Sequence, residues 1–201
     1  MNTPLLPPLP EKEAIALLEP FEGLELRDIV VVVTAQDAER AAVALLAAGV
    51  VGFDTESKPT FARNEVNTGP HVVQFSTRQT AWLFQLHRTE CNVALADLIA
   101  SPALVKVGFG LSNDLTLLRS RLGVEPQALI DIDTEFRRRG YRKSVGVKAA
   151  VALIFDRRFV KSRKATTSNW ANKQLTDAQI RYAANDAYAS ICVYDALAVG
   201  R

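Results

Sequence analysis

The stretch Val50–Glu56 constrains this chain most, because an apolar run there ends in two acids separated by a single residue. Successive side chains of a strand alternate between its faces, so Asp54 and Glu56 point one way while Phe53 and Thr55 point the other. Two carboxylates on one face repel each other unless a cation holds them, and hard oxygen ligands suit Mg²⁺ or Mn²⁺. A solvated strand end entering a loop is the competing interpretation, so the rest of the chain has to supply partners.

The bulk properties favour one ordinary globular domain. With 201 residues, of which 48% are hydrophobic and 23% charged, the chain is long enough for a proper core. We see no secretory signal and no apolar run of membrane-spanning length, so we expect no membrane partner. The two cysteines, Cys91 and Cys192, have no metal-ligand spacing around them, and a reduced cytoplasmic protein is the simplest expectation.

The formal net charge of +2 hides a basic segment at 137–173. It holds twelve of the 24 Lys and Arg residues but only one of the 22 acids, Asp156, so its local charge is +11. Such a block in a near-neutral protein indicates a surface that faces a polyanion. Solvated helix faces would produce the same composition.

Hydrophobic periodicity predicts a mixture of strands and helices in one α/β domain. The region 57–70 has Pro, Asn and Gly without periodicity and is predicted to be a long loop. Thr34 and Ser112 are predicted helix caps, and 71–77 with 82–86 is predicted to be an antiparallel hairpin. We expect strands over 29–33, 50–56, 71–77, 82–86, 104–109 and 128–132, helices over 11–18, 35–48, 93–100 and 112–122, and helical structure from there to the end.

A third acid, Asp114, falls in the first turn of a predicted helix after a strand and a glycine turn. The helix dipole favours an anion there, so a purely structural role competes with a ligand role. The neighbouring glycines lack both the Gly-Lys-Ser/Thr ending and the full Gly-x-Gly-x-x-Gly pattern, which excludes the common nucleotide motifs.

The last predicted helix carries a fourth acid. Thr176 and Gln179 form a capping box, so the helix begins there. Tyr182 and Asp186, four residues apart, lie one turn from each other. They form either a simple surface pair or a site that reaches a shared metal ion and water.

Taken together, these residues resemble the three motifs of the DEDD 3′–5′ exonucleases, namely Asp54-Thr55-Glu56, Asp114 in a Gly-x-x-x-Asp context, and Tyr182-Ala183-Ala184-Asn185-Asp186-Ala187. The tyrosine four residues before the last acid marks the tyrosine subtype, whereas the histidine subtype has His at the position of Arg181. The segment Ser168-Asn169-Trp170 is especially similar to the exonuclease domain of the Werner-syndrome helicase, with RNase D next.

The resemblance implies a ribonuclease-H-like fold over 26–201, a mixed β-sheet flanked by helices on both faces, preceded by an N-terminal arm over 1–25. It implies that Asp54, Glu56, Asp114 and Asp186 hold two divalent cations, Mg²⁺ or Mn²⁺, while Tyr182 orients the attacking water. The implied reaction is hydrolysis of a nucleic acid from its free 3′ end, with release of nucleoside monophosphates. Resemblance to the Werner-type domain favours DNA, and RNase D makes RNA possible. The oligomeric state stays open.

The basic segment then has an expected role in tracking the phosphate backbone without reading sequence. Trp170 could stack on a base, but a tryptophan just before a long helix is more often a packing residue. The candidate nucleic-acid contacts are Thr55, Arg157, Arg158, Lys161, Arg163 and Lys164.

Three other functions use the same residues. A non-catalytic nucleic-acid-binding module would keep the fold, although the presence of all four acids and the tyrosine argues against decay. A different metal-dependent hydrolysis, of a small nucleotide for example, needs the same ligands. A glycosidase also uses paired carboxylates, but it needs no divalent ion and leaves the basic segment unexplained.

Overall fold

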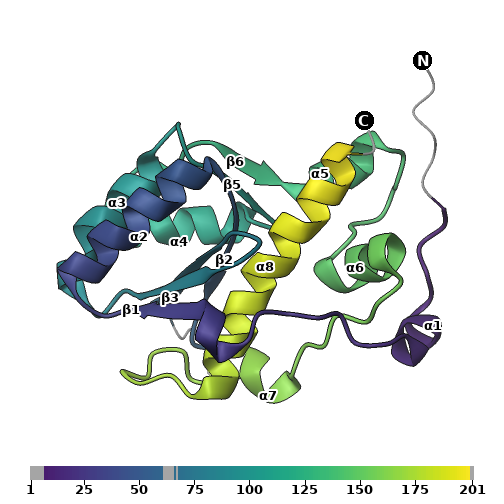
Figure 1. Ribbon diagram of the computed structural model, residues 1–201, viewed down its shortest axis with the longest axis horizontal. Coiled ribbons are helices and arrows are strands. Elements are labelled where there is room, and N and C mark those ends of the chain that lie inside the picture. Colours follow the sequence, from purple (N-terminus) through teal and green to yellow (C-terminus); the bar gives the residue numbers. More distant parts are fainter. Residues whose placement is uncertain (1–6, 61–65, 67, 200–201) are drawn as a thin grey trace.

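A mixed six-stranded sheet organises the chain, as the computed structural model in Figure 1 shows; it describes residues 7–60, 66 and 68–199, apart from the side chains of Asn113, Arg163 and Val199. The strands are β1 (Ile29–Val32), β2 (Val50–Glu56), β3 (Val72–Ser76), β4 (Ala81–Gln85), β5 (Val105–Gly108) and β6 (Leu129–Asp131). Their order in the sheet is β1-β4-β3-β2-β5-β6. β3 is antiparallel to both β2 and β4, whereas the pairs β1–β4, β2–β5 and β5–β6 are parallel.

Helices cover both faces of this sheet, as expected. On one face lie α2, α3 and α4, and on the other the long helix α8 crosses the strands, with α6 beside it (Figure 1). The helices are α1 (Lys12–Leu17), α2 (Ala35–Ala48), α3 (Asn92–Ala100), α4 (Ser112–Leu122), α5 (Ile132–Arg138), α6 (Val147–Phe155), α7 (Arg163–Thr166) and α8 (Asp177–Val199), with short 3₁₀ turns at Leu26–Asp28 and Thr89–Cys91. Within the described ranges, no helix is both long enough and apolar enough to cross a membrane.

Most predicted elements are confirmed, with ends that shift by one or two residues. The hairpin of β3 and β4 has the expected antiparallel pairing. The capping boxes of Thr34 with Asp37 and of Thr176 with Gln179 are both present. The order of the strands places β2 between β3 and β5, near the middle of the sheet, where its apolar residues are covered on both faces.

The predicted cap at Ser112 is wrong. Ser112 is the first residue of α4, and its side chain makes no capping bond. Asp131, at the end of β6, binds the turn just before the helix, where its carboxylate accepts hydrogen bonds at 3.2 Å from the backbone N–H groups of both Gly110 and Leu111. These bonds hold the turn that leads into α4 and are not a helix cap, because a capping side chain accepts from the second or third N–H group inside the helix.

Residues 7–25, here called the N-terminal segment, pack against the C-terminal half of the chain. The ring of Phe21 lies 5.3 Å from that of Phe155 and 6.0 Å from that of Tyr188. Arg158 forms an isolated parallel bridge with Pro20 and donates from Nη1 to the carbonyl of Ala16 at 3.0 Å. The predicted arm therefore has a defined path over residues 7–25, while residues 1–6 lie outside the described part of the chain.

Candidate active site

The site is built where α8 crosses β2. Gly52 on β2 makes the close approach possible, because a Cβ atom there would lie 1.8 Å from the carbonyl oxygen of Ala187 and 3.0 Å from the backbone nitrogen of Ile191. Gly52 shares a strand face with Asp54, two residues on, and Ala187 follows Asp186 in the helix. The same crossing that requires glycine therefore places Asp186 beside Asp54.

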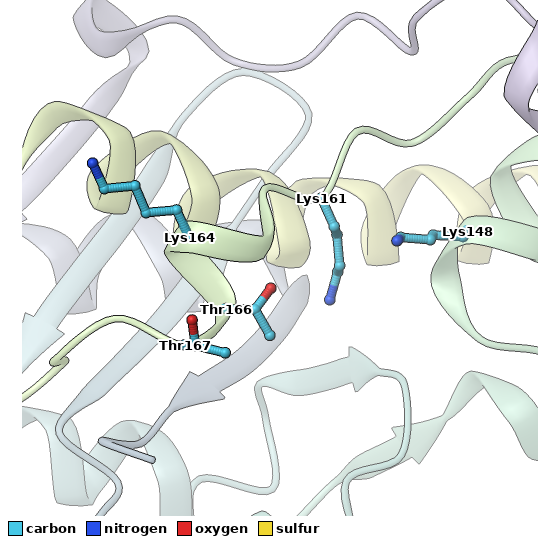
Figure 2. Close-up of a pocket in the computed structure, with 5 residues that line it drawn as sticks. All are labelled: Lys148, Lys161, Lys164, Thr166 and Thr167. Carbon is cyan, nitrogen blue, oxygen red and sulfur yellow. The ribbon is translucent and has the colours of Figure 1, made fainter.

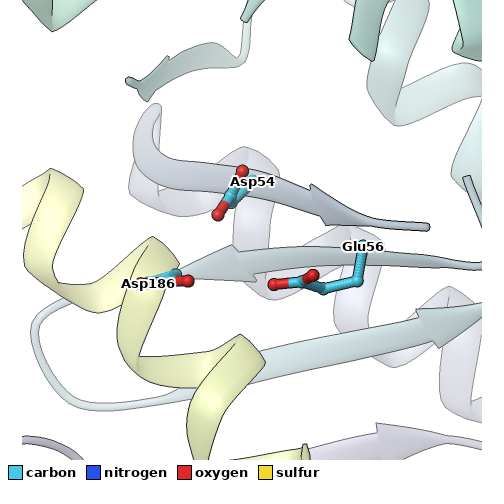
Figure 3. Close-up of side chains that lie close together, drawn as sticks. All are labelled: Asp54, Glu56 and Asp186. Atoms are coloured by element: carbon cyan, nitrogen blue, oxygen red, sulfur yellow. The ribbon is translucent and has the colours of Figure 1, made fainter. Parts of the chain in front are cut away.

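Three of the four predicted acids converge at this crossing. Oxygen atoms of Asp54, Glu56 and Asp186 all lie within 4.8 Å of one another. Figure 3 shows the carboxylates of Glu56 and Asp186 pointing toward each other, with Asp54 next to them on the strand. Alternation along β2 puts the first two acids on one face, as predicted. The packing of α8 on that face brings the third, Asp186, which is 3% exposed.

The fourth acid, Asp114, lies outside this cluster and is held by Thr55. The Thr55 hydroxyl donates to Oδ1 of Asp114 at 2.7 Å, from the face of β2 opposite to Asp54 and Glu56. Burial raises the pKa of Asp114. Its charge also contributes to the raised pKa values of Asp54 and Glu56, so it belongs to the same electrostatic environment. Thr55 thus has an internal partner in addition to its predicted role toward nucleic acid.

The clustered acids resist ionisation. Burial is the main cause that raises the pKa of Asp54 well above its usual range, followed by the charge of Asp186. The pKa of Glu56 rises to about 9 for the same reasons, burial first and then the neighbouring Asp54. Burial also raises the pKa of Asp186, although Lys161 opposes that change. Three such groups become stable carboxylates at neutral pH only when strong positive charge is brought to them.

One ammonium group reaches the cluster from the loop before α7. Nζ of Lys161 lies 2.8 Å from Oδ2 of Asp186 and 5.5 Å from the ring centre of Tyr182. Its single charge cannot balance three carboxylates. Both oxygens of Asp186 are buried, and the ammonium of Lys161 contacts only Oδ2. Oxygen ligands with unmet acceptor capacity fit a divalent cation, which supplies the missing charge and coordination.

Tyr182 projects from α8 one turn before Asp186. Its hydroxyl lies 3.1 Å from Oγ1 of Thr166, and its ring packs 5.8 Å from that of Trp170. Burial, and next the charge of Asp186, raises the pKa of Tyr182 to about 12, so the phenol is protonated at neutral pH and can orient a water molecule. Trp170 is 1% exposed, which confirms it as a packing residue.

The basic residues predicted to contact nucleic acid do not all lie together. Lys161 and Lys164 line a pocket of about 710 Å³ together with Lys148, Thr166 and Thr167. Figure 2 shows the ammonium groups of Lys161 and Lys148 converging, while that of Lys164 points away from them. Here this set of five residues is called the basic pocket.

The two neighbouring arginines are engaged elsewhere. Nη1 of Arg157 donates to the backbone carbonyl of Asp156 at 2.8 Å, and Arg158 is bound to the N-terminal segment as described above. Neither lines the basic pocket. The side chain of Arg163 lies outside the described residues, so its predicted contact stays a prediction.

Sequence reasoning missed three residues of this region. Gly52 and Lys148 carried no motif, although a glycine inside an apolar strand can indicate a close backbone approach. Gln74 on β3 pairs directly with Asp54 and therefore shares its face of the sheet. It is fully buried, and both atoms of its amide lack a hydrogen-bond partner among the described residues. A polar residue in the apolar run of 72–75 was the available signal.

Comparison with known proteins shows that the chain is similar to 3′–5′ exonucleases. A family model described as "3'-5' exonuclease" matches residues 29–199. The chain is 25% identical over 152 residues to the bifunctional 3′–5′ exonuclease/ATP-dependent helicase WRN of Mus musculus, covering 74% of this chain and 11% of that protein. It is 30% identical over 126 residues to ribonuclease D of Pseudomonas paraeruginosa, covering 63% and 33%. The chain therefore spans only a part of these relatives.

A solved structure shows the same architecture. The EXO domain of Nibbler from Aedes aegypti superposes with a TM-score of 0.73 at 21% identity, covering 88% of this chain and 90% of that one. At this identity the likeness concerns the fold alone. The sheet order and the two helical layers are those of the ribonuclease-H-like exonucleases.

Proposed function

Since the chain belongs to the 3′–5′ exonuclease family, we propose that it removes nucleoside monophosphates from the free 3′ end of a nucleic acid by metal-dependent hydrolysis. The observation that carries the proposal is the convergence of Asp54, Glu56 and Asp186 within 4.8 Å, two from a central strand and one from a helix packed on its glycine. Partly or fully buried carboxylates with raised pKa values repel one another when ionised, and a bound cation offsets that repulsion.

We assign the cations as two Mg²⁺ or Mn²⁺ ions, held by Asp54, Glu56, Asp186 and, on the second ion, Asp114. When bound, a pair of such ions lowers the pKa of water and neutralises charge on the phosphate and the leaving oxygen. Thr55 keeps Asp114 in position through the 2.7 Å hydrogen bond. Tyr182, protonated at neutral pH, orients the attacking water through its hydroxyl.

Lys161 contacts both the acid cluster and the basic pocket. It pairs with Asp186 at 2.8 Å and also lines the basic pocket, so its ammonium is within reach of an anion bound there. Lys148 and Lys164 add charge to the same pocket. We assign the basic pocket to the phosphate groups next to the scissile bond, which it binds without reading the base sequence.

DNA is the favoured substrate, because the Ser168-Asn169-Trp170 segment resembles the Werner-type domain. RNA is the second candidate, favoured by the similarity to a protein named ribonuclease D. Contacts to the 2′-hydroxyl distinguish the two polymers.

A time course on four substrates tests the proposal: single-stranded DNA, DNA with a recessed 3′ end, RNA, and a DNA strand with a blocked 3′ end. Each is incubated with Mg²⁺, with Mn²⁺ or with EDTA. We expect a ladder that shortens from the 3′ end, monophosphate products, and no reaction with EDTA or the blocked end. Internal cleavage, or undiminished turnover in EDTA, would refute the proposed function.

A further inference from the structure

A groove beside the acid cluster has no part in the chemistry described so far. It has a volume of about 1100 Å³ and opens where the N-terminal segment faces α6. Leu9, Lys12 and Ile15 line it from the N-terminal segment, and Lys143 and Val147 line it from the beginning of α6 and the loop before it. Residues 158–161 also line it, and Arg158 bridges to Pro20 of the N-terminal segment.

This groove, here called the strap groove, is continuous with the proposed active site. Lys148 and Lys161 line both the strap groove and the basic pocket. Lys161 also lies 2.8 Å from Asp186, and the charge of Lys148 acts on the same carboxylate. A polymer bound at the acids can therefore extend along these two lysines into the strap groove.

The lining combines exposed cations with apolar surface. Lys12, Lys143 and Lys148 are exposed, and none of them takes part in the ion pairs found among the described residues. Glu11 is the single acid of the lining. Between the cations lie apolar side chains, of which Val160 is 62% exposed. Cations fit phosphates, and apolar surface fits the faces of unpaired bases.

We propose that the strap groove binds the single-stranded part of the substrate that lies upstream of its 3′ end. This inference rests on the proposed function for the position of the scissile bond. A duplex keeps its base faces stacked inside and offers only its backbone and groove edges to such apolar surface, so the lining favours a single strand. The family model matches residues 29–199, so the wall formed by the N-terminal segment lies outside the matched region.

The double variant Lys12→Ala/Lys143→Ala tests the inference, because it removes two exposed cations from opposite walls. The matched control Arg40→Ala/Arg119→Ala removes two exposed cations from α2 and α4, on the other face of the sheet. Affinity for a labelled single-stranded 12-mer is measured by fluorescence anisotropy on metal-free protein in EDTA, over a series of salt concentrations. Hydrolysis rates of the 12-mer and of a dinucleotide are then compared with Mg²⁺.

We expect the groove variant to bind the 12-mer about tenfold more weakly and to lower the slope of log affinity against log salt by about 1.4, at roughly 0.7 per lost phosphate contact. The ratio of 12-mer to dinucleotide hydrolysis should fall by a similar factor, because a dinucleotide is too short to reach the strap groove. The variant Lys12→Arg/Lys143→Arg should restore both quantities.

An affinity and salt slope equal to those of the control would overturn the inference, as would an equal loss on dinucleotide and 12-mer. Loss of binding to a fully paired, blunt duplex that matches the loss on the single strand would also overturn it. Failure of the proposed function gives a different result, since no substrate would then be hydrolysed by the unsubstituted protein, whatever the binding of the groove variant.

Discussion

Lys106 and Lys161 each hold an ammonium group against oxygen acceptors, and the surroundings of these two lysines differ in kind. Lys106 on β5 is fully buried and donates to three backbone carbonyls, those of Leu98, Ile99 and Ser101, at 3.0–3.1 Å. Lys161 meets a side-chain carboxylate, Asp186, in a cluster of acids that one ammonium cannot neutralise. The first lysine uses all three donors on fixed acceptors, and the second has surplus negative charge around it.

This difference indicates a structural role for Lys106 and a role at the active site for Lys161. The carbonyls around Lys106 are those at the end of α3, where a helix leaves its last acceptors unsatisfied and its dipole favours a cation. Burial lowers the pKa of Lys106 to about 8. The acids around Lys161 instead keep an excess of charge that a second positive group has to balance. Substitution of Lys106 should therefore change stability, whereas substitutions in the acid cluster should change turnover or metal affinity.

The largest expected effect belongs to Asp186→Asn, which removes a charge from the acid cluster. We expect turnover to fall about a thousandfold or more, because the stabilisation that a bound cation gives a transition state is worth several kcal/mol. Asp195→Asn, on the same helix, is a matched control, and its rate should stay within about twofold of the unsubstituted protein. Asp54→Ala should behave like Asp186→Asn and keep the fold by circular dichroism. A fully active Asp54→Ala protein with excess Mg²⁺ or Mn²⁺ would show the site assignment to be wrong.

Tyr182→Phe should have the next largest effect, a loss of about a hundredfold in turnover, since positioned groups that assist proton transfer contribute about that much. The substitution keeps the ring that packs on Trp170 and removes only the hydroxyl. The Mn²⁺ affinity of the variant, measured by calorimetric titration, should equal that of the unsubstituted protein. A weaker Mn²⁺ affinity together with an unchanged rate would contradict the role given to this phenol.

Lys106→Met should act on stability instead of rate. It leaves three buried carbonyls without donors, and we expect the free energy of unfolding to fall by about 2 kcal/mol. In a chain of this size that lowers the melting temperature by roughly 4–8 °C. The exposed Lys173→Met is the control, with a change below about 0.5 kcal/mol. The specific activity of folded Lys106→Met should match the unsubstituted protein at low temperature; a large loss there would remove the contrast between the two lysines.

The acid cluster should also be visible in the pH dependence of stability. The folded pKa of Glu56 is about 9, above its ordinary value of 4.5, so between these pH values the folded state binds more protons than the unfolded state. The metal-free protein should therefore be most stable below about pH 4.5 with respect to this group and lose that contribution as the pH rises toward 9. Melting curves from pH 5 to 9 in EDTA check the slope, and saturating Mg²⁺ should flatten it. If Mg²⁺ left the slope of stability against pH unchanged, the groups responsible for that slope would lie outside the acid cluster.

The smallest effect is expected for Lys161→Met. The ammonium opposes cation binding, so its removal should raise the affinity for Mn²⁺ by about tenfold, equivalent to about 1.4 kcal/mol of released repulsion. The metal-free protein should lose stability at pH 8, because Asp186 then loses its ion-pair partner and keeps only the more distant charge of Lys148. Calorimetric titration and thermal melting measure the two quantities. Equal Mn²⁺ affinities in the two proteins would show that Lys161 and the metal do not compete.

Several features of the site were predictable because they depend on local geometry. Alternation along a strand is enough to put Asp54 and Glu56 on one face, and the helical repeat is enough to put Tyr182 one turn from Asp186. The Thr176 capping box likewise fixes where α8 begins. These relations span at most four residues, so the chain alone defines them.

Other features were not predictable, because they depend on contacts between segments that are far apart in the sequence. No local pattern shows that Asp131 holds the turn before α4, or that Arg158 holds the N-terminal segment. Each involves groups that are far apart in the sequence, and several side chains compete for the same partner. Sequence patterns name the candidates, and packing selects among them.

The sequence by itself determined the set of acids, their order and the faces on which they lie, since backbone geometry over a few residues leaves no alternative. Only the tertiary structure decided that α8 presses on Gly52 closely enough to bring Asp186 to Asp54. It also decided that the buried Lys106 serves a helix end while the partly exposed Lys161 faces the acids. Local alternation is set by covalent geometry, whereas these contacts exist only because the sheet order and helix packing bring distant side chains within a few ångströms.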